Sequence, residues 1–142
     1  MPDRTPAQLY ALLVGVGLLA GGVLGFFYSA SFATGDAIER DAVLGILDVN
    51  AWHNLVHIAT GVLALAVVGS YSASRGFALA LGVVYMLVAL IGFAAGDGEA
   101  IAGLLPVNSE DNVLHVLIAV SGLLAYAATP ATPAPSTVEP SA

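Results

Sequence analysis

The chain alternates between long apolar segments and short polar segments. Four segments contain no Asp, Glu, Lys or Arg, and they cover roughly residues 7–27, 52–69, 76–95 and 112–128. Each has about the 17 to 25 residues that an α-helix needs to cross the hydrocarbon core of a bilayer. We therefore expect an all-α fold in which four transmembrane helices form a bundle.

The polar segments that precede the second and fourth helices repeat each other. Residues 45–57 have the sequence GILDVNAWHNLVH and residues 103–115 have the sequence GLLPVNSEDNVLH, a displacement of 58 positions. The first and third helices also align, at an offset of 67 positions. An internal repeat indicates two copies of one structural unit, here a helical hairpin. We expect repeat 1 over about residues 7–70 and repeat 2 over about residues 76–128.

The number of helices in each repeat sets the symmetry. Because each hairpin crosses the membrane twice, the two hairpins have a parallel orientation and their pseudo-two-fold axis should run along the membrane normal. We expect one four-helix membrane domain over residues 1–128, with the first apolar segment retained because it is longer than the core of a secretory signal. Residues 129–142 contain four prolines and no apolar face, which predicts a disordered Pro/Thr/Ser-rich tail.

Composition agrees with a membrane location and excludes several classes of protein. The chain is 58% hydrophobic and 9% charged, with a mean hydropathy of +0.92, whereas about a quarter of the residues of a soluble domain are charged. It has no cysteine, which excludes disulfides, thiolate metal sites and iron–sulfur clusters. Its three basic residues are too few to bind nucleic acid or anionic lipid headgroups.

The charged residues separate between the two ends of the bundle. The loops at residues 28–51 and 96–111 carry the whole net charge of −7, and the four charged residues at the other end cancel one another. By the positive-inside tendency, Arg4 and Arg75 place the N and C termini in the cytoplasm of a multi-pass plasma-membrane protein. The absence of lysine and the pI of about 4.4 give a halophile-like acidic composition, which high salt would screen.

Small residues and one tyrosine indicate how the helices pack. Gly17, Gly21 and Gly25 are spaced by four, which predicts a face where another helix can approach closely. We expect further close approaches at Gly61, Gly69, Gly82, Gly92 and Gly122. Tyr85 lies near the middle of the third helix, so its hydroxyl should find a partner on another helix.

Each repeat places three polar side chains around the start of its second helix. They are Asn50, Asn54 and His57 in the first copy and Asn108, Asn112 and His115 in the second. Asn50 and Asn108 stand where an asparagine side chain can cap a helix. In each copy the second Asn and the His share one helical face, and polar groups at that depth must be satisfied. We therefore interpret these residues as polar pairs that organise the bundle.

The same segments supply potential metal ligands. His53 and His57 lie four residues apart, as do Asp111 and His115. If the pseudo-symmetry brings the second and fourth helices together, these four residues offer imidazole and carboxylate ligands for zinc or another divalent metal. Asp111 is equally well placed for a capping box. A b-type haem between His57 and His115 is a further alternative, opposed by the scarcity of basic residues for its propionates.

The functional classes that remain are few. No arrangement of nucleophile, base and acid is visible, so we expect a non-enzymatic protein and predict no cofactor outside the metal and haem alternatives. The expected partners are the lipid bilayer and either a second copy of the chain or another membrane protein, with no nucleic acid. An oligomeric channel or carrier is a further hypothesis, because four short helices leave little room for a polar lumen in one chain.

The paired V-N-x-x-x-N-x-x-H segments, residues 49–57 and 107–115, resemble a family of small prokaryotic four-helix integral membrane proteins catalogued as a domain of unknown function. The similarity spans about residues 7–128. The resemblance implies a four-helix membrane fold and no activity. Its recurring polar positions correspond to Asn50, Asn54, His57, Asn108, Asn112 and His115. The resemblance does not extend to His53 and Asp111.

Overall fold

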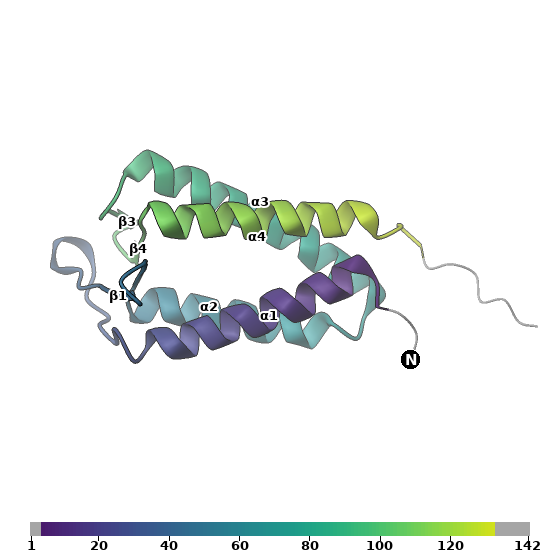
Figure 1. Ribbon diagram of the computed structural model, residues 1–142, viewed down its shortest axis with the longest axis horizontal. Coiled ribbons are helices and arrows are strands. Elements are labelled where there is room, and N and C mark those ends of the chain that lie inside the picture. The colour runs from purple at the N-terminus through teal and green to yellow at the C-terminus, as the bar shows by residue number, and fades with distance from the viewer. Residues whose placement is uncertain (1–3, 133–142) are drawn as a thin grey trace, which may run out of the picture.

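The computed structural model describes residues 4–132. Within this range, four long helices form two antiparallel hairpins (Figure 1). The first hairpin pairs α1 (Pro6–Gly25) with α2 (Ala51–Val67), and the second pairs α3 (Tyr71–Ala95) with α4 (Ser109–Ala128). The predicted four-helix bundle is therefore confirmed.

The outer surface of the bundle is suited to lipid. Within the described residues, α1, α3 and α4 are long and apolar enough to cross a membrane, and α2 is a shorter apolar helix of 17 residues. Large apolar side chains such as Leu13 and Leu124 are more than 60% exposed, whereas the buried positions of α1 include Ala7, Ala11 and Gly15. Small residues inside and large apolar residues outside are typical of helices that pack in a bilayer. The helices thus indicate a membrane protein in contact with lipid.

Local sequence determines where the helices begin. α1 starts with a capping box between Thr5 and Gln8, in which each side chain accepts a hydrogen bond from the backbone N–H of the other residue. α2 and α4 start after Asn50 and Asn108, whose side-chain oxygens accept hydrogen bonds from the backbone amides three residues later. These two asparagines are the N-caps that the sequence predicts, and each cap contributes about 1 kcal/mol.

A short β-ribbon connects the two helices of each hairpin, and the sequence prediction missed both ribbons. In the first, β1 (Asp41–Val43) pairs antiparallel with β2 (Leu47–Val49), after the 3-10 turn η1 (Gly35–Ala37). In the second, β3 (Ala100–Ile101) pairs antiparallel with β4 (Leu105–Pro106). Both ribbons lie at the end of the bundle opposite the start of α1 and the end of α4 (Figure 1).

Each ribbon turns through two residues with positive φ. These angles are 55° at Leu44 and 71° at Gly45 in the first ribbon, and 54° at Ala102 and 66° at Gly103 in the second. Two successive positive φ angles are typical of the type I′ turn, which matches the twist of a tight hairpin. Glycine adopts this conformation readily, so the two glycines explain how such short strands can reverse direction.

The prediction of close approaches at glycines was partly wrong. A Cβ atom on Gly61 would lie 2.6 Å from the backbone nitrogen of Leu19, so α1 and α2 do approach closely there. Similar crowding is found at Gly25, Gly82, Gly92 and Gly122. In contrast, Cβ atoms on Gly17, Gly21 and Gly69 would meet no other described atom within 4 Å. The face of α1 that packs on α2 instead carries Gly15, Gly22 and Gly25, and a spacing of four could not distinguish the two faces.

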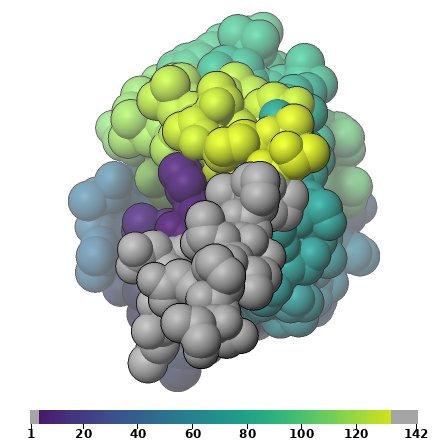
Figure 2. Space-filling model, turned by 90° about the vertical axis from the view of Figure 1, so that its right-hand side faces the viewer, coloured from purple at the N-terminus to yellow at the C-terminus, as the bar shows by residue number. Residues whose placement is uncertain are grey.

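The starts of α1 and α3 and the end of α4 gather at the other end of the bundle (Figure 2). Thr129 is buried there: its hydroxyl accepts a hydrogen bond from the Ala7 amide at 3.0 Å and donates one to the Ala125 carbonyl at 2.8 Å. Arg75 donates to the Thr129 carbonyl at 2.8 Å. Thr129, which the sequence assigns to the tail, is thus fixed to the bundle, and residues 133–142 of that tail lie outside the described residues.

Candidate metal centre and its flanking cavities

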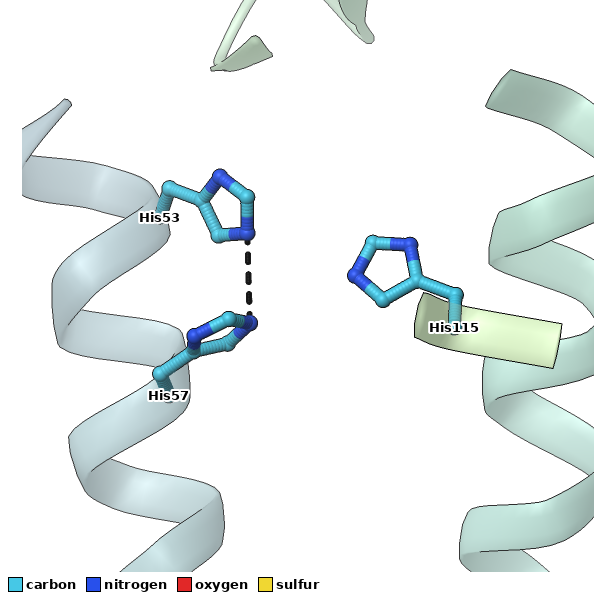
Figure 3. A group of neighbouring side chains, drawn as sticks. All are labelled: His53, His57 and His115. Atoms are coloured by element: carbon cyan, nitrogen blue, oxygen red, sulfur yellow. Dashed lines mark hydrogen bonds between the residues drawn. The ribbon is translucent and has the colours of Figure 1, made fainter. Parts of the chain in front are cut away.

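Three histidines from the two hairpins face one another at the ribbon end of the bundle. His53 and His57 extend from α2 towards His115 on α4 (Figure 3). The Nε2 atoms of His53 and His57 are 3.2 Å apart, and one ring nitrogen from each of the three residues lies within 4.8 Å of the other two. His53 and His115 are buried, at 3% and 4% exposure. The structure therefore brings together three of the four residues considered as metal ligands.

Asp111 is engaged elsewhere. Its Oδ2 atom accepts hydrogen bonds from the backbone amide of Asp48 at 2.9 Å and from that of Asn108 at 3.3 Å. The second bond completes a capping box at the start of α4, and the first ties α4 to β2 of the opposite hairpin. The carboxylate therefore acts as a cap and a bridge between the hairpins, outside the histidine cluster.

The spacing of the histidines suits a metal ion. Zinc–nitrogen bonds are about 2.0 to 2.1 Å long, so two ligand nitrogens of a tetrahedral zinc lie about 3.3 Å apart. The 3.2 Å between the Nε2 atoms of His53 and His57 is close to that value, and it also fits a hydrogen bond between two imidazoles. His115 would approach by about 1 to 2 Å to complete a three-histidine site.

Some ring nitrogens of the cluster lack a partner. The Nδ1 atoms of His53 and His115 are buried and make no hydrogen bond within residues 4–132. Buried polar atoms are nearly always paired with protein, water or an ion. The hydrogen-bonding capacity of the cluster is therefore not met by its described neighbours.

The two cap asparagines join the hairpins reciprocally. The Asn50 side chain donates to the Leu104 carbonyl at 2.7 Å, and the Asn108 side chain donates to the Ile46 carbonyl at 2.6 Å. Leu104 and Ile46 belong to the ribbon turns of the opposite hairpins, and they lie 58 positions apart, as do the asparagines. Each asparagine thus caps its own helix and holds the ribbon of the other hairpin. The sequence predicted the two caps, but it did not predict the hydrogen bonds from the same side chains to the opposite ribbons.

The second pair of asparagines packs inside its own hairpins. The oxygen of the Asn54 side chain occupies the space that a Cβ atom on Gly25 would need, and Asn112 stands in the same relation to Gly92. The Asn54 amide also donates to the Ser29 carbonyl at 2.9 Å. These contacts fix α2 against α1 and α4 against α3, and they explain why a glycine stands in the last turn of α1 and of α3.

Two cavities flank the histidine cluster. The α2–α3 cavity has a volume of about 280 Å³, and its polar lining includes all three histidines and Tyr85. The α1–α4 cavity has a volume of about 310 Å³, and its polar lining consists of His57 and Asp111. His57 thus borders both cavities. α2 and α4 face each other across the histidines without the close backbone packing seen inside each hairpin.

Corresponding positions of the two halves line the two cavities. Ile101 of β3 lines the α2–α3 cavity and Val43 of β1, 58 positions earlier, lines the α1–α4 cavity. Tyr85 corresponds in the same way to Leu18, 67 positions earlier. The α2–α3 cavity is therefore the one with a hydroxyl group in its wall. Gly17 and Gly21 of α1 line the other cavity. They do not mediate close helix packing, and their lack of a side chain leaves space in this cavity.

Tyr85 is the residue whose environment differs most from expectation. It is 6% exposed, and its ring stands edge-on to that of His115, with centroids 5.3 Å apart and planes at 84°. Its hydroxyl is buried and has no hydrogen-bond partner in the described part of the chain. The predicted bond to another helix is therefore absent from those residues, and an unpaired buried hydroxyl costs about 1 to 3 kcal/mol.

The ribbon end carries the acidic loops. Arg40 lies 3.9 Å from the Asp48 carboxylate and donates to the Gly98 carbonyl of the other hairpin. Burial raises the pKa of Asp48, and the nearby positive charge of Arg40 opposes that shift. An excess of carboxylates at this end raises the local concentration of cations close to the histidines.

Comparison with known proteins gives a family and no activity. No curated protein and no solved structure matches the chain. The family model for DUF4383, a domain of unknown function, matches residues 8–128, the region that holds both ribbons and the histidine cluster. The match agrees with the resemblance found in the paired motifs. The chain belongs to the DUF4383 family.

Proposed function

We propose that this protein is an integral membrane protein that binds a divalent first-row transition-metal ion through His53, His57 and His115. The observation that carries the proposal is the convergence of three ring nitrogens within 4.8 Å at the junction of the two hairpins. Imidazole suits zinc, copper, nickel and iron, and two histidines four residues apart on one helix face are a common zinc-binding arrangement. Three protein ligands leave a fourth position open.

An ion would join all three histidines, which the hydrogen bond alone does not. The bond between the Nε2 atoms of His53 and His57 leaves His115 outside it, whereas an ion would be bound by one ring nitrogen of each residue. The other ring nitrogen of a metal-bound histidine usually binds a carbonyl, a carboxylate or water. The unpaired Nδ1 atoms of His53 and His115 would take such a partner.

A second candidate function is purely structural, with the Asn/His pairs organising a non-enzymatic bundle. The reciprocal bonds of Asn50 and Asn108 support it. It is compatible with a bound ion, because the asparagine bonds involve none of the histidine nitrogens.

The haem hypothesis is opposed by the position of His53. Its ring centroid lies 4.5 Å from that of His57 and 6.1 Å from that of His115, whose centroids are 6.4 Å apart. The His53 ring therefore stands beside the axis that joins the two candidate ligands, where the macrocycle would have to fit.

We also propose that the fold consists of two tandem copies of one hairpin, related by a pseudo-two-fold axis along the membrane normal, within one domain over residues 1–128. The paired asparagine bonds and the corresponding linings of the two cavities support this. Arg4 and Arg75 favour cytoplasmic termini in a plasma-membrane protein.

The test of metal binding is elemental mass spectrometry of the protein purified without a polyhistidine tag, loaded with zinc and desalted. We expect about one zinc per chain, reduced at least about tenfold by His57→Ala, because two remaining imidazoles bind a divalent ion weakly. The control is Asp97→Asn/Glu99→Gln, which removes two acidic side chains of the ribbon-end loop and should leave the zinc content unchanged. Equal zinc content in the wild type and His57→Ala, or none in either, would overturn the proposal.

A further inference from the structure

We propose that the α2–α3 cavity binds the headgroup of a membrane quinone. The inference goes beyond metal binding, because it rests on the shape and chemistry of the cavity and not on the ion. Four observations carry it: the lateral opening of the cavity, its lack of charge, its polar groups and its size.

The cavity opens towards lipid between α2 and α3. Among its lining residues, Val56, Leu63 and Val84 are 44%, 55% and 51% exposed on the outer surface of the bundle. α2 and α3 are consecutive in the chain, yet they have little contact with each other compared with the helices within each hairpin. A membrane-soluble molecule could therefore enter from the side and leave an apolar tail in the bilayer.

The side chains around this cavity offer no charge to a ligand. Among the described residues around it there is no Lys, Arg, Asp or Glu, and most are aliphatic. In the metal-free protein, a phosphate or carboxylate headgroup placed there would lose its hydration without an oppositely charged partner. The metal-free cavity therefore fits an uncharged occupant.

The cavity has polar groups on its otherwise apolar wall. They are the three histidine rings, Thr60, and Tyr85, whose ring stands edge-on to that of His115. The Tyr85 hydroxyl is a hydrogen-bond donor without an acceptor among the described residues. A saturated acyl chain offers no acceptor, whereas the carbonyl oxygen of a quinone accepts such a bond.

Size limits the headgroup to a single ring. An apolar protein cavity of about 150 Å³ holds one benzene molecule. The 280 Å³ of the α2–α3 cavity therefore suits one substituted six-membered ring with its first tail atoms. An uncharged ring with carbonyl oxygens and an apolar tail is the chemistry of a membrane quinone.

The test is titration of the purified protein in lipid nanodiscs with decylubiquinone, with bound quinone measured after separation from empty nanodiscs. We expect saturable binding of about one quinone per chain. Val88→Phe, which fills the cavity, should weaken binding at least about tenfold, or about 1.4 kcal/mol. The matched control is Leu87→Phe, at the neighbouring position that is 54% exposed, and it should change affinity less than about twofold.

A second pair of variants tests the hydrogen bond. Tyr85→Phe should weaken decylubiquinone binding about three- to tenfold, because it removes the donor and keeps the ring. Tyr10→Phe should leave binding unchanged, because the Tyr10 hydroxyl already donates to the Ile118 carbonyl at 2.9 Å outside this cavity. Wild-type zinc content in Tyr85→Phe would show that the metal site survives.

Several results would overturn the inference. They are non-saturable partition of the quinone, equal affinities of Val88→Phe and Leu87→Phe, and displacement of the quinone by stearic acid at equal concentration, which would indicate an acyl-chain site. Zinc uptake is measured on the same preparations, and each titration is run both on the zinc-loaded protein and after removal of metal with a chelator. Absence of saturable quinone binding in both states, in protein that takes up zinc, refutes the quinone site alone. Saturable quinone binding to protein that takes up no zinc when loaded refutes the metal site alone.

Discussion

At the scale of single residues, the two glycines in the last turns of α1 and α3 show most directly how sequence determines packing. Gly25 and Gly92 leave room for the amide oxygens of Asn54 and Asn112, which are buried at 1% exposure. Neither oxygen has a conventional hydrogen-bond donor in the described residues. Close contact with a glycine Cα–H is a weak substitute of the kind found where helices cross tightly.

Gly92→Ala should destabilise the protein by about 1 to 3 kcal/mol, because the new methyl group overlaps the Asn112 side chain in a packed interior. The measurement is thermal unfolding in detergent followed by circular dichroism. The control is Gly76→Ala in the same helix, where a Cβ atom meets no described atom within 4 Å and alanine favours the helix. Equal melting temperatures for the two variants would show that the Gly92–Asn112 contact does not hold the helices.

Residue identity also determines which polar side chains join the histidine cluster. The i, i+4 spacing of His53 and His57 correctly predicted that their side chains lie together. Asp111 and His115 have the same spacing, which made Asp111 an equally good candidate for a fourth ligand. Two backbone amides, one of them from the opposite hairpin, bind that carboxylate instead. A partner 63 residues away in sequence leaves no local pattern, so this choice required the structure.

At the scale of elements, the caps of α2 and α4 do more than start helices. Each asparagine satisfies an amide of its own helix and holds a ribbon turn of the other hairpin. The helices and their caps could be predicted, because apolar length and cap residues are local signals. The ribbons could not, because strands of two or three residues are too short to show an alternating pattern.

Asn50→Ser should lower stability by about 0.5 to 1.5 kcal/mol, because serine keeps the cap and loses the bond to the Leu104 carbonyl. Chemical unfolding in a mild detergent measures the change. Thr5→Ser serves as the control, since Thr5 caps α1 and its side chain makes no bond to the opposite hairpin in the described structure. An Asn50→Ser variant as stable as Thr5→Ser would argue against the reciprocal bonds as a link between hairpins.

At the scale of the whole molecule, the two hairpins meet around the histidines and leave a cavity on either side. Their junction combines the asparagine bonds, the bridge from Asp111 to the Asp48 amide, and the three imidazoles. An ion at that point would link α2 of one hairpin to α4 of the other. Binding to the folded state alone would then stabilise the entire bundle, by an amount that grows with the logarithm of the ion concentration.

The central claim is that the three histidines bind a metal ion, and X-ray absorption spectroscopy at the zinc edge of the untagged, zinc-loaded protein tests it most directly. We predict about three imidazole nitrogens at roughly 2.0 to 2.1 Å and one water oxygen at the open position. In His115→Ala only two imidazoles remain, so the bound zinc and its imidazole signal should fall at least about tenfold, as in His57→Ala. A first shell of oxygen atoms alone, unchanged in His115→Ala, would contradict the account and leave the histidines as packing residues.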